Sequence, residues 1–288
     1  MVAAPLRDRM RRGRAPVPGG RLRCAGMGDN VLFEKRDGVG VVTLNRPDRM
    51  NAWNSSLESD YWDAVDEAMA ADDVRVIVFT GAGRGYCVGA DFDVLQGIQQ
   101  TGQEERKERP PLHSTLRLAK PTIAAINGAC AGMGLAQAVM CDLRFAASGA
   151  KFTTAFSRRG LIAEFGLSWT LPRVVGRSNA LDLLMSGRTF TAEEAAEMGL
   201  VNRVLPGDLL MDHVMDYAID MATYASPASM AVIKQQVIAD ESASYAESCE
   251  RYPVLMKASF TRPDFKEGVK SFLEKRKPAF PGVPDDLK

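Results

Sequence analysis

Two short β-branched runs open the hydrophobic pattern of the chain, at residues 31–36 (VLFEKR) and 39–44 (VGVVTL). Asp37-Gly38 lies between them, and this dipeptide favours the tight turn of a β-hairpin. Apolar residues then recur at helical spacing over 57–69, which predicts a helix with one buried face. Ser55-x-x-Glu58 at its start has the pattern of a capping box. We therefore expect Ser55 to cap a helix that ends near residue 71.

A buried strand, a glycine-rich turn and a helix follow one another twice in the middle of the chain. Residues 74–83 (VRVIVFTGAG) are almost continuously apolar and end in glycines, and residues 122–142 repeat this arrangement. A continuous apolar run is typical of a strand buried on both faces, as in a parallel sheet. Further strands are expected at 143–148, 151–156 and 199–206. The sequence predicts an α/β body of repeated ββα turns, with helices from about residue 208 to the end.

Charge separates the first 28 residues from the rest of the chain. The formal net charge of the 288 residues is zero, yet residues 1–28 contain seven arginines and one acidic residue, Asp8. The remainder is therefore acidic overall, which argues against a nucleic-acid-binding surface. We expect a basic disordered extension over 1–28, a core over 29–207 and a helical C-terminal region over 208–288. The extension is either a transit peptide or the product of a start upstream of Met27, and its lack of serine favours the second.

The five cysteines have no ligand-like spacing, so reduced thiols in a cytoplasmic protein are the simplest expectation. The uncharged run 121–141 raises the question of a membrane span, but three glycines and Asn127 in its middle favour a buried strand, turn and helix. We expect no membrane association. No His/Cys/carboxylate cluster suggests a metal site, and no dinucleotide fingerprint suggests a bound cofactor.

The segment NGACAGMGLAQAVMCD (127–142) places glycines directly before a helix. A helix N-terminus attracts an anion or a carbonyl oxygen that becomes one, and glycines let a ligand approach the backbone. Two such turns, at Gly89-Ala90 and at 132–134, could direct two N–H groups at one oxygen, which is the design of an oxyanion hole. Close packing of helix on strand explains the same glycines equally well.

The chain resembles the enoyl-CoA hydratase/isomerase (crotonase) family. The matching stretches, in order, are NRPDRMNAWN, VIVFTGAGRGYCVGADF, KPTIAAINGACAGMGLAQAVMCDLRFA, LPRVVGRSNALDLLMSGRTFTAEEAAEMGLVNRVLP and FKEGVKSFLEKRKPAF. The resemblance implies a ββα spiral core with a helical C-terminal oligomerisation region, assembled as a homotrimer or homohexamer. It also implies an acyl thioester of coenzyme A as the substrate, with no further cofactor.

The resemblance assigns roles to individual residues. The backbone N–H groups of Ala90 and Met133 match the family's oxyanion hole. The positions that match CoA-binding residues of the family are Arg84, Ala52, Gly89, Phe272 and Lys275. For Lys275, the solvated face of a charged helix is an equally good interpretation.

The chain departs from the family at two positions. Family hydratases hold a catalytic water between two glutamates, and this chain has Ala136 and Phe156 there. Glu164 instead matches the single catalytic acid of the Δ3,Δ2-enoyl-CoA isomerase branch. One carboxylate in an apolar wall (Ile162, Phe165, Leu167, Trp169) would have a raised pKa and could move a proton from Cα to Cγ. We expect double-bond isomerisation with Glu164 as acid and base; a hydratase with a non-standard acid and a catalytically silent acyl-CoA binder remain alternatives.

Overall fold

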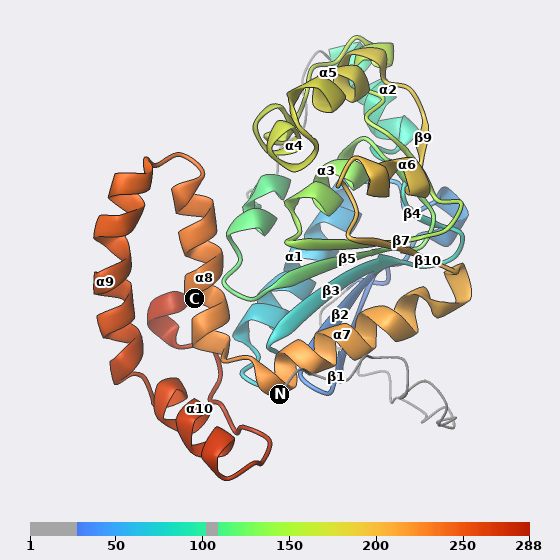
Figure 1. Ribbon diagram of the computed structural model, residues 1–288. Helices are drawn as coiled ribbons and strands as arrows, with labels where there is room; N and C mark the ends of the chain where they lie inside the picture. The colour runs from blue at the N-terminus through green and yellow to red at the C-terminus, as the bar shows by residue number, and fades with distance from the viewer. Residues whose placement is uncertain (1–27, 102–108) are drawn as a thin grey trace.

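The computed structural model describes residues 28–101 and 109–288. Its centre is a six-stranded sheet with the order β1-β2-β3-β5-β7-β10 (Figure 1). The strands are β1 (Val31–Arg36), β2 (Val39–Leu44), β3 (Val76–Gly81), β5 (Thr122–Ile126), β7 (Leu143–Ala147) and β10 (Arg203–Leu205). Only β1 runs antiparallel to its neighbour; the other pairs are parallel. The basic extension predicted for residues 1–28 lies outside the described residues except for Gly28.

The predicted hairpin is confirmed. Val31 pairs with Leu44 and Arg36 pairs with Val39, so Asp37 and Gly38 form a two-residue loop. Both residues have positive φ, at 49° and 84°, as a type I′ turn requires. The predicted strand after it is also confirmed, because all six residues of β3 are buried between parallel neighbours.

A second, smaller sheet with the order β4-β6-β8-β9 lies next to the first. Its strands are β4 (Gly85–Cys87), β6 (Ala129–Ala131), β8 (Lys151–Thr153) and β9 (Phe190–Thr191). The consecutive pairs β3–β4, β5–β6 and β7–β8 each place one strand in the large sheet and one in the small sheet. Each pair is followed by a helix, so the predicted ββα repeat is confirmed. The first two of these helices are α2 (Phe92–Thr101) and α3 (Met133–Met140).

Helices cover both faces of the large sheet. On one face α1 (Ser55–Ala70) and α3 bury their apolar residues against Val42, Ile77 and Phe79. On the other face α7 (Leu210–Tyr224) packs on Val39, Val76 and Val78. The first helix of the predicted C-terminal region is therefore part of the packing around the sheet.

The start of α1 corrects the sequence-based cap. The helix begins at Ser55, and the N-cap is Asn54, whose side-chain oxygen accepts from Leu57 N–H at 2.9 Å. Ser55 is the first helical residue. The pattern S-x-x-E places the N-cap one residue too late, because Asn54, also a strong capping residue, directly precedes it.

Replacing the cap tests this correction. Asn54→Ala is expected to lower the free energy of unfolding by ~1 kcal/mol, because Leu57 N–H loses its acceptor. Ser55→Ala is the control and is expected to change it by less than about 0.5 kcal/mol, as is usual for surface positions. Urea unfolding measures both values. A larger loss for the serine variant would return the cap to Ser55.

The helices between β8 and β10 are not among the predicted elements. They are α4 (Leu167–Val175), α5 (Arg177–Ser186) and α6 (Ala192–Glu197). Gly176 and Gly187 have positive φ and end α4 and α5 after two or three turns. The short runs between these glycines are too brief to show a clear helical period. The connections between these elements include the 3₁₀ turns η2 (Pro47–Arg49), η3 (Leu112–Arg117), η4 (Ser157–Arg159) and η5 (Gly207–Leu209).

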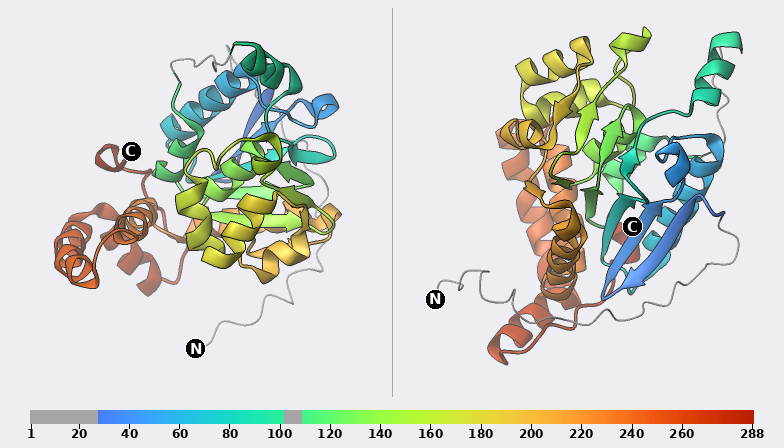
Figure 2. Two further views of the ribbon diagram at one scale, coloured as in Figure 1. Left: turned by 90° about the horizontal axis from the view of Figure 1, so that it is seen from above. Right: turned by 90° about the vertical axis from the view of Figure 1, so that its right-hand side faces the viewer.

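The remaining helices form an arm beside the core. They are α8 (Pro227–Asp240), α9 (Tyr245–Thr261) and α10 (Pro263–Leu273), and the 3₁₀ turn η6 (Asp285–Leu287) follows them. Figures 1 and 2 show α9 outermost, with α8 between it and the core. Lys234 of α8 binds Asp142 at the end of α3 at 2.8 Å. No helix in the described part of the chain is long and apolar enough to cross a membrane, and the expected cytoplasmic location stays a prediction.

Candidate functional site

Two glycine turns meet at the ends of neighbouring strands of the small sheet. Gly89 follows β4 and Gly132 follows β6, and both have positive φ, at 94° and 49°. A Cβ atom at Gly89 would lie 3.1 Å from Ala131 O and 3.6 Å from Gly132 Cα. The two turns therefore touch through main-chain atoms, with no side chain between them. This contact places Ala90 and Met133, the residues that follow these glycines, in one region.

Hydrogen bonds to Trp53 set the orientation of Ala90. Trp53 N–H donates to Gly89 O at 2.7 Å, and Asp91 N–H donates to Trp53 O at 2.8 Å. Ala90 lies between the two residues that bond to Trp53. In a parallel bridge of this kind, such a residue directs its own N–H and C=O to the opposite side. The N–H of Ala90 therefore points away from Trp53.

Arg46 fixes the residue after Ala90. Its Nη2 donates to Asp91 Oδ2 at 2.8 Å, and both side chains are largely buried. Burial alone would raise the pKa of Asp91, but the hydrogen bond and charge of Arg46 outweigh it and the pKa is lowered. Asp91 is thus a charged anchor for the turn at neutral pH.

Met133 is the first residue of α3. Gly132 N–H donates to Thr153 O at 3.1 Å. The first backbone hydrogen bond of the helix runs from Ala136 N–H to Gly132 O at 2.9 Å. The N–H groups of Met133, Gly134 and Leu135 are therefore at the open N-terminal end of the helix, where a partial positive charge is concentrated.

The glycines of this segment serve different purposes. A Cβ atom at Gly134 would lie 2.3 Å from Cys87 O and 2.6 Å from Cys87 Cβ. No side chain fits there, so the packing interpretation of the glycines is confirmed at Gly134. At Gly89 and Gly132 the positive φ and the contact between the turns determine the residue type.

Apolar side chains occupy the two positions that the resemblance matches to the glutamates of hydratases. Ala136 is fully buried, and Phe156 is 5% exposed. Both belong to the main hydrophobic cluster, on which Met133 also packs. Neither position can take or give a proton.

Glu164 lies in the irregular segment between η4 and α4 and is partly buried. Its neighbours Ala163 and Phe165 both pack on the cluster that contains Ala136 and Phe156. Glu164 O accepts from Leu167 N–H at 3.0 Å, and α4, which starts there, packs on α3. The segment that carries Glu164 is thus joined to the helix that begins at Met133.

The apolar wall predicted around Glu164 is only partly correct. Leu167 is fully buried, and Phe165 and Trp169 are partly buried. Ile162, however, is 82% exposed and does not contribute to a wall. It follows the turn after η4 on the outside of the molecule, whereas the chain turns inward only at Ala163.

The CoA-binding residues suggested by the resemblance fall into two groups. Ala52 is 6% exposed and directly precedes Trp53, so it lies beside Gly89 and Ala90. Arg84 precedes β4 and is at the opposite end of that strand from Gly89; its Nε donates to Met50 Sδ at 3.0 Å. Phe272, 82% exposed, and Lys275 lie at the end of α10, far from α3 in Figure 1. Within this chain, the end of α10, which carries Phe272 and precedes Lys275, is therefore not near the glycine turns.

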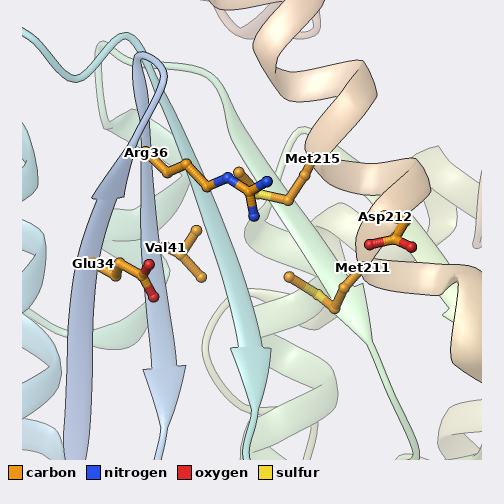
Figure 3. Close-up of a pocket in the computed structure, with 6 residues that line it drawn as sticks. All are labelled: Glu34, Arg36, Val41, Met211, Asp212 and Met215. Atoms are coloured by element: carbon orange, nitrogen blue, oxygen red, sulfur yellow. The ribbon is translucent and has the colours of Figure 1, made fainter. Parts of the chain in front are cut away.

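Two pockets in the described part of the chain lie away from these turns. One, of 140 Å³, is on the α7 face of the sheet, between Glu34, Arg36 and Val41 of the hairpin and three residues of α7 (Figure 3). The other, of 280 Å³, is lined by Arg84, Asn127 and Lys151 among others, at the starts of the small-sheet strands. Among residues 28–101 and 109–288, no three His, Cys, Asp or Glu side chains are grouped so as to hold a metal ion.

Sequence reasoning missed the side chains that hold the turns. Asn51 is fully buried, and its Nδ2 donates to Gly85 O at 2.8 Å and to Ala82 O at 3.0 Å. Arg46 and Trp53, described above, belong to the same segment, NRPDRMNAWN. The available signal was a dense set of polar residues in a stretch with no hydrophobic period, which is typical of side chains that bond to backbone.

Comparisons with known proteins identify the family of the chain. A family model described as enoyl-CoA hydratase/isomerase matches residues 34–283. The 1,2-epoxyphenylacetyl-CoA isomerase of Escherichia coli is 34% identical over 259 residues, which cover 88% of this chain and 98% of that protein. A probable enoyl-CoA hydratase of Rhodobacter capsulatus is 34% identical over 254 residues, with the same coverage of both chains.

Solved structures give the same answer for the fold. A Mycobacterium marinum enoyl-CoA hydratase is 52% identical, covers 73% of this chain and 97% of its own, and has a TM-score of 0.64. A Mycobacterium abscessus structure described as a putative enoyl-CoA hydratase/isomerase is 30% identical, with a TM-score of 0.81 over 88% of this chain and 99% of its own. The chain belongs to the enoyl-CoA hydratase/isomerase family and has its crotonase fold.

Proposed function

We propose that this family member isomerises acyl-CoA thioesters by moving a double bond, with Glu164 as the only acid and base. Two observations together support the proposal. The main-chain contact between Gly89 and Gly132 groups two N–H-bearing residues, while Ala136 and Phe156 are buried and apolar. Such a site can stabilise an enolate but lacks the usual pair of groups that would activate water.

The proposed reaction moves one proton across three carbons. The carboxylate of Glu164 takes a proton from Cα of a 3-enoyl thioester, and the electron pair of that C–H bond delocalises to the thioester oxygen as a dienolate. The N–H groups of Ala90 and Met133 donate to this oxygen. The electron pair then returns through the chain, Cγ takes the proton from the Glu164 carboxylic acid, and the double bond forms between Cα and Cβ.

One relative supports isomerisation over hydration. The Escherichia coli protein is named as an isomerase of a CoA thioester, although its named substrate carries an epoxide and not a simple double bond. Several other relatives are named as probable hydratases. The choice between isomerisation and hydration therefore rests on the chemistry of the site residues. The carboxylate among them is that of Glu164.

A substrate panel tests the proposal. Purified protein is given 3-enoyl-CoA and 2-enoyl-CoA thioesters of short, medium and long chains, and conjugated thioester is followed by ultraviolet absorbance. We expect isomerisation of 3-enoyl-CoA to exceed hydration of 2-enoyl-CoA at every chain length that is accepted. Faster hydration would favour a hydratase with a non-standard acid. Binding of both classes with turnover of neither would favour a catalytically silent binder.

CoA recognition by the arm is the second part of the proposal. Phe272 and Lys275 lie too far from the turns to serve the same protomer, so we propose that they contact CoA bound to a neighbouring copy. Lys275→Ala is expected to weaken butyryl-CoA binding about tenfold, because a charged hydrogen bond to phosphate is worth ~1.5–3 kcal/mol. Calorimetry measures the change, with Lys277→Ala as the control. Equal affinities for the two variants would remove Lys275 from the site.

The third part is assembly as a trimer or hexamer. The arm exposes many large apolar side chains. A helical segment without a partner surface is not expected to expose so much apolar area. The exposed side chains are those of Ile233, Val237, Tyr245, Tyr252, Val254, Met256, Phe260, Phe265, Val269, Phe272 and Leu273.

A charge placed in this surface should dissociate the assembly. Val254, 71% exposed on α9, is replaced by Asp, and sedimentation velocity is expected to show smaller species than the wild type. Met185→Asp on α5, at a residue of 68% exposure, is the matched control and should sediment like the wild type. A wild-type monomer at micromolar concentration would contradict the proposal.

A further inference from the structure

A chain of buried polar side chains lies beneath the candidate site. Tyr86 OH donates to Gln137 Oε1, Gln137 Nε2 donates to Tyr61 OH at 3.3 Å, and Tyr61 OH is 2.9 Å from Thr115 Oγ1. None of the four side chains is more than 1% exposed. This network joins β4, α3, α1 and η3; β4 leads to the turn at Gly89, and both β4 and η3 pack on α3.

The two phenols are held in their neutral form. Burial raises the pKa of Tyr61 and raises the pKa of Tyr86 well above its ordinary value. Both hydroxyls therefore keep their protons at neutral pH. Gln137 uses its oxygen for Tyr86 and its nitrogen for Tyr61, and the hydroxyls of Tyr61 and Thr115 share the last bond. Every member has a partner, and such networks hold elements in one arrangement.

One hydrogen bond of this buried network connects the elements that carry the two glycine turns. Tyr86 is on β4, four residues before Ala90. Gln137 is on α3, four residues after Met133 and thus about one helical turn along the same face. The Tyr86–Gln137 bond therefore connects the strand that leads to one N–H group with the helix that begins at the other. The contacts of Gly134 with Cys87 stop the helix from moving closer to the strand, but they do not stop it from rotating or sliding.

We propose that Gln137 and Tyr86 are positioning residues that fix the N–H groups of Ala90 and Met133 relative to each other, so that both reach one thioester oxygen. This inference rests on the proposed function, because it requires those N–H groups to form the oxyanion hole. Neither residue touches the substrate. Their contribution is to keep the helix in register with the strand, and displacement of a catalytic group by 1 Å can cost about 10²-fold in rate.

The experiment measures how strongly the site polarises a bound carbonyl. Butyryl-CoA labelled with ¹³C at the thioester carbonyl has no double bond to move, and infrared difference spectra give its C=O stretch free and bound. In the wild type the bound stretch is expected at lower frequency than the free one. Gln137→Leu is expected to lose a large part of this shift, to lower kcat for 3-enoyl-CoA about tenfold or more, and to change KM less than about threefold.

Two further variants separate positioning from general stability. Tyr86→Phe keeps the ring and removes only the hydroxyl, and we expect it to reproduce the Gln137→Leu spectrum even if the leucine variant folds poorly. The double variant should lose no more of the shift than Gln137→Leu alone, because both act through one bond. Thr115→Val removes a bond at the other end of the chain and is expected to lower Tm while leaving the carbonyl frequency unchanged.

The outcomes distinguish this inference from the function on which it rests. A wild-type protein that binds butyryl-CoA without shifting its carbonyl stretch has no oxyanion hole at this site, and both ideas fail. A wild-type shift that Gln137→Leu and Tyr86→Phe retain in full leaves the proposed function standing and overturns the positioning role. A loss of shift in Thr115→Val as large as in Tyr86→Phe would also overturn it, since the effect would then follow stability.

Discussion

Glu164→Gln is expected to lower the rate of 3-enoyl-CoA isomerisation by roughly 10²–10⁴-fold, the usual effect of removing a general acid/base. The amide has nearly the same size as the carboxylate but cannot accept the Cα proton. Binding should persist, because the thioester oxygen and the CoA portion are contacted by other groups. Steady-state rates and calorimetric titration with butyryl-CoA measure the two effects separately.

The control for this variant is Glu197→Gln, at an exposed position on α6. It changes the same functional group and is expected to leave kcat unchanged. If Glu164→Gln keeps full activity, the assignment is wrong. The next candidate is then His113, an exposed residue on η3, which packs on α3.

Met133→Pro is expected to lower kcat by roughly 10²–10³-fold, the cost of one lost oxyanion-hole donor. Proline has no N–H, and at the first position of a helix it fits the backbone without breaking a helical hydrogen bond. Met133 occupies this position in α3, and the preceding residue is a glycine. The variant therefore deletes one donor and leaves the helix intact.

Met133→Ala is the matched control, because it removes the same side chain and keeps the N–H. We expect it to change KM through lost packing but to keep kcat within about tenfold of the wild type. Circular dichroism checks that the proline variant is folded. Equal kcat values for the proline and alanine variants would show that this N–H does not contact the reacting oxygen.

The sequence was most informative where one local rule governs the chain. The Asp37-Gly38 turn follows from turn chemistry, and the buried strand predicted within 74–83 follows from continuous apolar character; both are confirmed, the strand as β3. The capping residue was wrong by one position, because Asn54 and Ser55 are both good caps and only the backbone decides between them. Helices α4 to α6 were not predicted, because glycines divide that region into short segments whose period is unreadable.

The sequence predicts the backbone turns of the site but not the arrangement of the side chains around them. Glycine before a helix pointed to the turns at Gly89 and Gly132, and they do meet. The exposure of Ile162 could not be predicted, because an irregular segment has no period that assigns a residue to a face. The support from Arg46 and Asn51 depends on contacts across 45 and 34 positions of the sequence, which no local pattern encodes.

The contact between the turns at Gly89 and Gly132 is made by backbone atoms alone. Glycine at position 89 therefore sets how closely the two turns can approach, because a Cβ atom there would meet main-chain atoms of the other turn. The residues at 136, 156 and 164 take no part in that contact. In the proposed mechanism, proton transfer and carbonyl binding are therefore separate tasks: the first belongs to one side chain, and the second belongs to two backbone turns that meet without a side chain between them.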